Sequence, residues 1–343
     1  MINLYSDTQT RPTPAMREAM ASAEVGDEQS FADPTVNALC ERVAELLGFE
    51  AAVFLPSGTM CNAIAFRLHI GPAGDEVYLH RTSHPIVAEA GGPAALSGAV
   101  LYPLDGERGM FTADTLRGAL RPAGDRYLPR SRLVSVEQTT NLTGGHVWPR
   151  EQLSAVVDVA REASLRLHMD GARLMNAVVA SGSSAASWAA GFDTAWVDFS
   201  KGLGAPVGAC LAGSRELIDE AWRYKQMWGG SMRQAGIIAA GALYALDHHV
   251  ERLADDHALA ASLARGLAEV PGVELDAASV TTNIVVFEVA DARALVARLA
   301  DAGVKMGALG PTTVRAVTHL DVDAEGAERA VAAVRAALAP VVS

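Results

Sequence analysis

The stretch Asp198-Phe199-Ser200-Lys201-Gly202-Leu203-Gly204-Ala205-Pro206 lies between two short apolar runs at residues 194–197 and 207–212. A single lysine between two strand-like runs, followed by small residues, is typical of an enclosed amine. A desolvated lysine loses its proton more readily and can attack an aldehyde cofactor to form a Schiff base. The alternative is a surface hairpin on which Lys201 is an ordinary solvated charge.

A second polar cluster, His168-Met169-Asp170-Gly171-Ala172-Arg173, changes the balance between these two interpretations. Residues 166–170 alternate strictly between polar and apolar, so His168 and Asp170 share one face of a predicted strand. A lysine that forms a Schiff base, together with an aspartate for a pyridinium nitrogen, is what pyridoxal 5'-phosphate (PLP) requires. Arg173 is close enough to share that pocket, although a structural salt bridge is the alternative for this cluster.

Bulk composition narrows the class of protein. The chain has 343 residues, half of them hydrophobic, which suffices for a large core and suggests two domains. Its net charge of -12, without a basic cluster, argues against nucleic-acid binding. No membrane span or signal peptide is recognisable, and the three scattered cysteines suit a reducing compartment rather than a disulfide or zinc framework. We therefore expect a soluble cytoplasmic protein without a metal site.

Two features early in the chain have the character of ligand contacts. A short apolar strand at 52–55 runs directly into Pro56-Ser57-Gly58-Thr59-Met60. A strand that turns through Ser57, Gly58 and Thr59 into a helix directs free backbone N–H groups and a hydroxyl at one point, which suits a phosphate; ordinary turn chemistry is the alternative. His84 follows the next strand and either stacks on a flat cofactor ring or is solvated.

Strands and helices alternate from residue 52 to 212, which predicts an α/β domain with a mainly parallel sheet covered on both sides. The polar residues 138–141 follow the predicted strand 133–137, at the strand end where ligands bind in open sheets. The predicted helices before and within this domain are 14–23, a helix from Pro34 to Gly48, and 149–163.

The last third of the chain follows a different pattern. A glycine-containing break at 228–234 precedes a long alanine-rich helical stretch that extends to about Val270. Predicted strands at 283–287 and 313–318, with helices at 292–302 and 324–338, form a smaller α+β domain. Arg315 interrupts an apolar strand, so it reaches either a buried acid or a cleft. We place the large domain at 1–245 and the smaller one at 246–343.

Nine segments in the same order resemble the PLP-dependent threonine aldolases, and the resemblance covers essentially the whole chain. It implies the fold type I architecture of PLP enzymes and cleavage of L-threonine, L-allo-threonine or related β-hydroxy-α-amino acids to glycine and an aldehyde. The segments are Ser6-Asp7-Thr8, Arg11-Pro12-Thr13, Gly26-Asp27, residues 33–37, residues 56–60, Glu89-Ala90-Gly91-Gly92, residues 168–173, residues 200–206 and Met232-Arg233-Gln234.

The resemblance also implies a role for individual residues. Lys201 would form the Schiff base, Asp170 would pair with the pyridinium nitrogen, and His84 would stack on the ring. Gly58 and Thr59 would hold the phosphate, beside Ser57, and Arg233 would contribute to phosphate binding or to a subunit contact. Ser6, Arg173 and Arg315 would receive the substrate carboxylate, which suits the bidentate geometry of arginine. The family forms dimers paired into tetramers with shared active sites, so we expect a homo-oligomer.

Three segments depart from the family pattern. Thr139-Thr140-Asn141 stands where the family usually has Thr-His-Asn, Lys225-Gln226 replaces Arg-Lys, and residues 30–32 lack the usual Tyr-Gly. Retro-aldol cleavage requires removal of the β-hydroxyl proton, and a threonine hydroxyl is too weak a base to replace imidazole. We expect Thr140 to orient a water or the substrate hydroxyl, with His84 or the cofactor phosphate as the acceptor.

PLP enzymes select the bond that breaks by orienting it relative to the ring, so cofactor residues do not fix the reaction. Proton removal from Cα would give transamination, racemisation or β-elimination. A PLP-binding homologue without catalysis is a further alternative, although retention of Asp170, Arg173 and Lys201 together argues against it.

Overall fold

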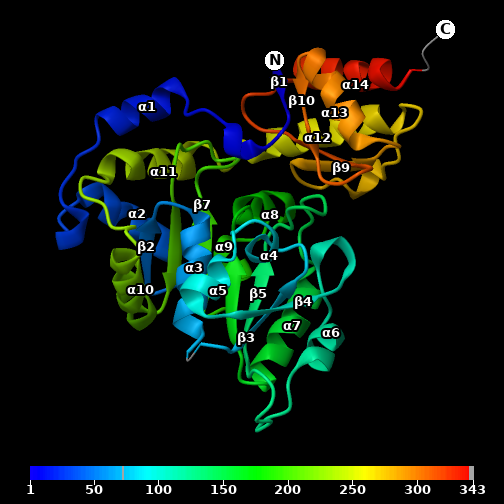
Figure 1. Ribbon diagram of the computed structural model, residues 1–343. Helices are drawn as coiled ribbons and strands as arrows, with labels where there is room; N and C mark the ends of the chain where they lie inside the picture. The colour runs from blue at the N-terminus through cyan, green and yellow to red at the C-terminus, as the bar shows by residue number, and fades with distance from the viewer. Residues whose placement is uncertain (72, 340–343) are drawn as a thin grey trace.

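A seven-stranded sheet organises the larger part of the computed structural model, which describes residues 1–71 and 73–339 (Figure 1). Strand order is β2-β8-β7-β6-β5-β3-β4, parallel except for β8, which runs antiparallel to both neighbours. The mainly parallel α/β sheet predicted from the sequence is therefore confirmed. Its strands are β2 (Ala51–Leu55), β3 (Glu76–His80), β4 (Val100–Leu104), β5 (Ser131–Glu137), β6 (Arg166–Asp170), β7 (Thr194–Asp198) and β8 (Ala209–Gly213).

Helices cover both faces of this sheet, and the alternation of side chains along the strands explains why. On β2, Val53 and Leu55 pack with α3 and α10, whereas Phe54 joins the core on the side of α2, α7 and α11. The helices are α1 (Pro14–Ala21), α2 (Pro34–Leu47), α3 (Gly58–His69), α4 (His84–Val87), α5 (Gly92–Ser97), α6 (Ala113–Ala119), α7 (Arg150–Glu162), α8 (Leu174–Ser181), α9 (Ala185–Ala189), α10 (Arg215–Met227) and α11 (Gly236–His248).

Local sequence signals fix the ends of α2 as expected. The Asp33 carboxylate caps the helix by accepting from the backbone N–H groups of Thr35 and Val36, at 3.1 and 3.0 Å, and Pro34 occupies the first helical position. Gly48 ends the helix at φ +74°, a left-handed conformation that glycine adopts without strain. The predicted helix is confirmed at both ends.

The smaller sheet, β11-β12-β9, is antiparallel and is packed by α12, α13 and α14 (Figure 1). The first residues of the chain belong to this part of the molecule, since β1 pairs in parallel with β10. The elements are β1 (Ile2–Asn3), α12 (Leu253–Ala268), β9 (Ile284–Glu288), α13 (Ala292–Asp301), β10 (Val304–Lys305), β11 (Gly307–Ala308), β12 (Thr313–Val317) and α14 (Ala324–Leu338).

Two element predictions need correction. The alanine-rich stretch up to residue 270 is divided between α11 and α12, because the chain turns after His248 and the His249 ring bonds the Leu203 carbonyl at 2.7 Å. No glycine or proline marks that break, so helix propensity alone predicts continuity. Strand β4 starts at Val100 rather than at residue 98, because Gly98 ends α5 at φ +67°.

In the described part of the chain, every helix is too short or too polar to cross a bilayer.

Candidate active site

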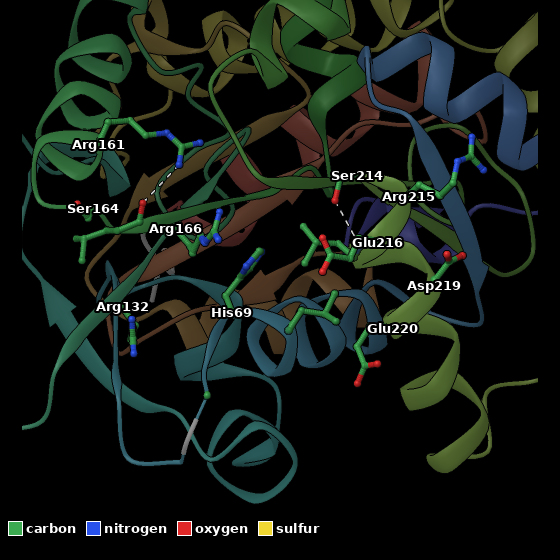
Figure 2. A pocket seen from close by; sticks show the side chains of 14 residues that line it. His69, Arg132, Arg161, Ser164, Arg166, Ser214, Arg215, Glu216, Asp219 and Glu220 are labelled. Carbon is green, nitrogen blue, oxygen red and sulfur yellow. Dashed lines mark hydrogen bonds between the residues drawn. The ribbon is translucent and has the colours of Figure 1, made fainter.

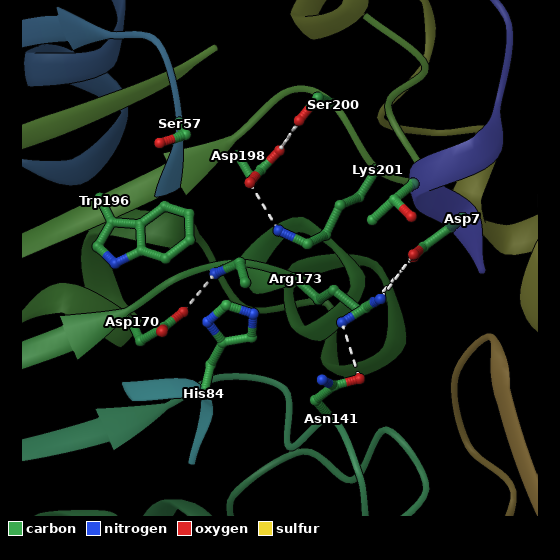
Figure 3. Close-up of polar contacts among 12 residues, drawn as sticks. Asp7, Ser57, His84, Asn141, Asp170, Arg173, Trp196, Asp198, Ser200 and Lys201 are labelled. Carbon is green, nitrogen blue, oxygen red and sulfur yellow. Dashed lines mark hydrogen bonds and ion pairs between the residues drawn. The ribbon is translucent and has the colours of Figure 1, made fainter. Parts of the chain in front are cut away.

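A small cavity opens at the carboxyl ends of the parallel strands, and Figure 3 shows the polar side chains that surround it. Its volume is about 180 Å³. This edge is where ligands bind in open α/β sheets. The cavity is lined by Thr8, Ser57, Gly58, Thr59, His84, Glu137, Asn141, Asp170, Ala172, Arg173, Trp196, Asp198, Ser200 and Lys201.

The turn from β2 into α3 forms one wall of the cavity. Ser57 caps α3, since its Oγ accepts from the Met60 N–H at 3.2 Å. A Cβ on Gly58 would lie 2.2 Å from the Trp196 ring, so only glycine fits there. The first N–H groups of a helix lack partners within it and attract anions together with the helix dipole. The geometry of residues 57–59 therefore suits a phosphate.

Lys201 lies on the loop between β7 and β8 and points into the cavity. Its Nζ donates to Asp198 Oδ2 at 2.6 Å, and its side chain is only 18% exposed. The other oxygen of Asp198 accepts from the N–H and the hydroxyl of Ser200, at 2.7 and 2.8 Å. The lysine is thus enclosed and held by a buried carboxylate, and the interpretation as a solvated surface lysine is wrong.

Asp170 ends β6 and is buried against α3. Its Oδ1 accepts from the Ala172 N–H at 3.1 Å, and its Oδ2 accepts from Asn62 Nδ2 at 2.8 Å. Burial raises the pKa of Asp170, and the hydrogen bond from Asn62 opposes that rise. His168 also contacts Asn62, at 3.1 Å, so the predicted common face of His168 and Asp170 is confirmed.

His84 is the first residue of α4 and lies beside Asp170 (Figure 3). Its Nδ1 is 2.9 Å from Glu89 Oε1, which leaves Nε2 as the ring nitrogen not engaged by this carboxylate. The hydrogen bond to Glu89 raises the pKa of His84, against the opposing effect of burial. A histidine oriented through one nitrogen by a buried carboxylate is the arrangement of a general base.

Two arginines meet at the other side of the cavity. Arg173 forms a bidentate ion pair with Asp7 at 2.8 and 2.6 Å, and its Nη1 also approaches Asn141 Oδ1 at 3.5 Å. Arg315 Nη1 donates to the same Asn141 oxygen at 2.9 Å, while its buried Nε has no hydrogen-bond partner among the described residues. Burial and the nearby Arg173 lower the pKa of Arg315. Arg173 is thus matched by a carboxylate, whereas Arg315 has only neutral acceptors among the described residues. An additional anion is therefore favoured beside Arg315.

Asp7 and Glu137 show opposite behaviour within this cluster. Burial would raise the pKa of Asp7, but the charge and hydrogen bonds of Arg173 outweigh it and lower that pKa to about 2. Glu137 ends β5 next to Asp170, and burial followed by the Asp170 charge raises its pKa to about 7. Its Oε2 accepts from the Asn141 N–H at 3.0 Å. Glu137 is therefore poised to exchange a proton near neutrality.

A much larger cavity of about 1,360 Å³ lies at the opposite end of the strands (Figure 2). We call this side, where the parallel strands begin, the amino edge of the sheet, and the side where they end the carboxyl edge. Three of its arginines form ion pairs: Arg161 and Arg166 with Asp193 at 2.9 and 3.0 Å, and Arg132 with Asp75 at 2.8 Å. The fourth, Arg215, donates from Nη2 to the Glu50 carbonyl at 3.5 Å. The acidic residues of α10 line the other wall. Size alone does not make this cavity a reaction site, since no lysine is among its described lining residues and three of its four arginines are held by aspartates.

The carboxyl-edge cavity has the groups that PLP requires. Residues 57–59 provide an anion cradle at a position where the Trp196 ring leaves no room for a Cβ on Gly58, and Asp170 is a buried carboxylate for a cationic nitrogen. Lys201 provides the amine, and Nε of Arg315, which has no partner among the described residues, can donate to a carboxylate. The residues present thus fit the cofactor and an amino acid together.

Residues 3–291 match the β-eliminating lyase family. The chain is 42% identical to the low specificity L-threonine aldolase of Escherichia coli K12, over 99% of this chain and 100% of that protein. It is 39% identical to the low-specificity L-threonine aldolase 1 of Arabidopsis thaliana, over 86% and 83% of the two chains. The chain belongs to the threonine aldolase family. This membership confirms the resemblance seen in the motifs, the expectation of an enzyme, and PLP as its cofactor.

The crystal structure of Leishmania major threonine aldolase is similar in fold. The TM-score is 0.85 at 20% identity, with 99% of this chain and 100% of that chain covered. At this identity the likeness speaks for the fold alone. It agrees with the fold type I architecture expected for this family member.

Four residues that the resemblance assigned to the site are not among those that line the cavity: Ser6, Thr140, Arg233 and Arg315, the last of which contacts the lining residue Asn141. Ser6 caps a short 3-10 helix, where its Oγ is bonded by the N–H and hydroxyl of Thr8. The Thr140 hydroxyl accepts from the His146 N–H at 3.1 Å and from the Thr143 hydroxyl at 2.9 Å. Arg233 is exposed and pairs with Asp27 at 2.8 Å. Their roles remain predictions.

The two other departures from the family pattern lie close to each other. Lys225 is fully buried and pairs with the equally buried Glu28 at 2.8 Å, with its Nζ 4.1 Å from the centre of the Trp222 ring. Phe31 adopts φ +56° and packs edge-on against the same ring. This region lies outside the cavity and connects the loop after α1 to α10.

Several residues of the site were not predicted as such. Asn62, Glu89, Glu137 and Asp198 contribute buried polar groups around the lysine, Asn141 contributes a partly buried amide, and Asp7 pairs with Arg173. The available signals were Asp7 and Glu89 within recognised motifs, Glu137 and Asn141 at a strand end, and Asp198 three residues before Lys201. Asn62 had no comparable signal, because a single asparagine within an apolar helix does not by itself indicate a functional residue.

Proposed function

We propose that this chain is a PLP-dependent carbon–carbon lyase that cleaves L-threonine, L-allo-threonine or related β-hydroxy-α-amino acids to glycine and an aldehyde. The observation that carries this proposal is the arginine pair beside the cavity. Arg173 and Arg315 converge on Asn141 Oδ1, and the buried Arg315 Nε is unpartnered within the described residues. A substrate carboxylate would give Arg315 the anionic partner that Asp7 already gives Arg173.

The remaining residues divide the chemistry between them. When bound, PLP supplies an electron sink for the electrons of the breaking bond. Lys201 would hold the cofactor through its amine, which Asp198 positions by accepting from Nζ at 2.6 Å. Asp170 would pair with the ring nitrogen, residues 57–59 would bind the phosphate, and Arg173 would serve the ring hydroxyl.

We assign the β-hydroxyl proton to His84 Nε2, directly or through one water. Glu89 holds the opposite ring nitrogen, and no histidine stands at position 140 in this chain. Thr140 contributes by holding the loop that carries Asn141, since its hydroxyl bonds two groups of the segment 143–146. Ser6 supports the carboxylate site from the same segment as Asp7.

The experiment is to supply L-threonine, L-allo-threonine and phenylserine to the holoenzyme and to assay glycine and the matching aldehyde. We expect both products in equal amounts from each substrate. The family described as β-eliminating lyases supplies the second candidate reaction. Ammonia with a keto acid, in place of glycine, would favour β-elimination and refute carbon–carbon cleavage.

We also propose that the chain forms a homo-oligomer, either a dimer or a dimer of dimers, in the cytoplasm. Apolar side chains are exposed on segments that lie next to one another: Phe31 at 62%, Met227 at 58% and Ile237 at 48%. Arg233 would take part in this contact. We also propose the division of the chain into a large domain, residues 1–245, and a smaller domain, residues 246–343. Light scattering of the purified holoenzyme tests it, and a monomer at micromolar concentration would refute it.

A further inference from the structure

The amide of Asn62, on α3, is the centre of a buried hydrogen-bond network beneath the active site. Its Nδ2 donates to Asp170 Oδ2 and to Glu89 Oε1, both at 2.8 Å. Its Oδ1 accepts from Trp196 Nε1 at 2.8 Å and faces His168 Nε2 at 3.1 Å. The Asn62 side chain is 1% exposed, so water does not compete for these bonds.

The direction of each bond follows from chemistry. An indole N–H only donates, and carboxylates only accept, so the amide orientation of Asn62 is fixed. His168 Nε2 must then carry the proton that it donates to Asn62 Oδ1. Burial lowers the pKa of His168 well below its usual range, so the ring is neutral and its Nδ1 is an acceptor.

The hydrogen-bond network continues from Asn62 toward the amino ends of the parallel strands. His168 Nδ1 is 2.8 Å from Thr194 Oγ1, which therefore donates to it. Thr194 Oγ1 is in turn 2.9 Å from His69 Nε2, which donates to the threonine. His69 ends α3 and lines the amino-edge cavity of Figure 2. These bonds form a row of hydrogen bonds that passes from His69 through Thr194, His168 and Asn62 to Asp170. All of them run in one direction, with each donor pointing toward Asp170.

We propose that Asn62 is a positioning residue for catalysis: it aims the Asp170 and Glu89 carboxylates as the last link of the directional row of hydrogen bonds that starts at His69. One amide thereby connects the carboxylate that serves the ring nitrogen to the carboxylate that orients His84. Hydrogen bonds that point the same way polarise one another, which strengthens the last bond to Asp170. The proposal rests on the proposed function insofar as Asp170 and His84 act in it.

Three variants test the proposal. Asn62→Ala removes both donors to the carboxylates. Thr194→Val keeps the shape of the side chain but cuts the row between His69 and His168. Ser97→Ala is the matched control, because Ser97 is equally buried and bonds the α3 backbone at Ala63 at 2.8 Å without a path to Asp170.

We expect Asn62→Ala to weaken PLP binding by the purified protein about tenfold or more, since each lost bond goes to a charged group. Thr194→Val should weaken it by roughly threefold, and Ser97→Ala should leave it within twofold while lowering the melting temperature. With threonine, kcat should fall in the same order and KM should change little. An Asn62→Ala protein with the affinity of the parent would overturn the proposal, as would equal losses in Ser97→Ala.

A second measurement needs neither cofactor nor activity. In ¹⁵N-histidine spectra of the cofactor-free protein, His168 should show the neutral Nε2–H form from pH 5 to 8, and Thr194→Val should shift its Nδ1 resonance. This remains decisive if Asn62→Ala does not fold. An Nδ1–H tautomer in the parent protein would refute the row. If the spectra and PLP affinities agree but threonine is not cleaved, the proposed function fails and the positioning role stands.

Discussion

The cavities at the amino and carboxyl edges of the main sheet are lined by similar kinds of charged residues, but these residues differ in how far they are buried. At the amino edge, the cavity of about 1,360 Å³ has arginines whose side chains are 41–61% exposed and paired with aspartates. At the carboxyl edge, the cavity of about 180 Å³ is surrounded by charged groups that are mostly buried, such as Asp170, Glu137 and Arg173. The smaller cavity carries the chemistry, because enclosed charges interact strongly whereas exposed pairs are screened.

Groups share partners at both edges, since Asp193 pairs with both Arg161 and Arg166 at the amino edge. Asn141 serves both Arg173 and Arg315, and Asn62 serves both Asp170 and Glu89. Exposed ion pairs contribute about 0–1 kcal/mol each, whereas removal of one member of a buried pair costs about 3–5 kcal/mol. Equivalent substitutions at the two edges should therefore differ widely in effect.

The largest difference should follow loss of Lys201. Lys201→Ala removes the amine that holds the cofactor, so turnover of threonine should fall by roughly three orders of magnitude or more. Borohydride treatment of the parent holoenzyme should attach the cofactor to Lys201, as peptide mass spectrometry would show. The chain has only two other lysines, Lys225, which is buried, and Lys305, which is on the surface, so the labelled lysine can be identified without ambiguity.

Lys305→Ala is the control for that variant. Lys305 bonds Gln9 at 3.1 Å on the surface, and its removal should leave turnover unchanged. Cofactor found on Lys225 or Lys305 after reduction would contradict the assignment of Lys201.

Arginine substitutions compare the two edges directly. Arg315→Ala should lower kcat/KM for threonine by about 30- to 1,000-fold, or about 2–4 kcal/mol, because a charge-assisted contact to the substrate carboxylate is lost. Arg166→Ala, at the amino edge, should change kcat/KM by less than twofold, since Arg166 is 61% exposed and paired with Asp193. Steady-state kinetics decide between them, and similar losses in the two variants would place the carboxylate elsewhere.

The sequence predicted the architecture and the principal site residues for identifiable reasons. Hydrophobic periodicity and capping residues determine elements such as α2, and strict alternation placed His168 and Asp170 on one face. The Lys201 and Ser57-Gly58-Thr59 segments are contiguous motifs, so each was recognisable without knowledge of the fold. Both now line one cavity.

The rest of the site depends on contacts between distant segments. Asp7 meets Arg173 across 166 positions, and Asn62 meets Asp170 across 108. Nothing in the local pattern distinguishes Asn62 from a polar residue on an exposed helix face. Conversely, the roles given to Thr140 and Arg233 came from motif position, whereas the structure directs the Thr140 hydroxyl into its own loop and Arg233 toward Asp27.

The pairing of His84 with Glu89 should show itself in the pH profile. Glu89→Gln removes the carboxylate whose hydrogen bond raises the pKa of His84, so that pKa should fall. The acid limb of kcat/KM should then move to lower pH, and the plateau should drop about tenfold because a weaker base transfers the proton less efficiently. His84→Phe keeps a ring for stacking and should abolish that limb. An unchanged limb in both variants would exclude His84 as the base.

The last prediction concerns stability and again contrasts the two edges. Burial raises the pKa of Glu137 from 4.5 to about 7, so the folded protein retains a proton that the unfolded chain releases. The resulting contribution to stability is complete below about pH 4.5 and is lost as the pH rises through 7. Glu137→Gln keeps an acceptor for the Asn141 N–H without the charge. It should therefore stabilise the cofactor-free protein at pH 8, by up to about 3 kcal/mol, and leave it nearly unchanged at pH 4.5. Glu220→Gln, an exposed amino-edge control, should shift stability by less than about 0.5 kcal/mol at either pH. Denaturant titrations at the two pH values give the comparison, and an equal gain for Glu137→Gln at both would show that its carboxyl does not titrate in this range.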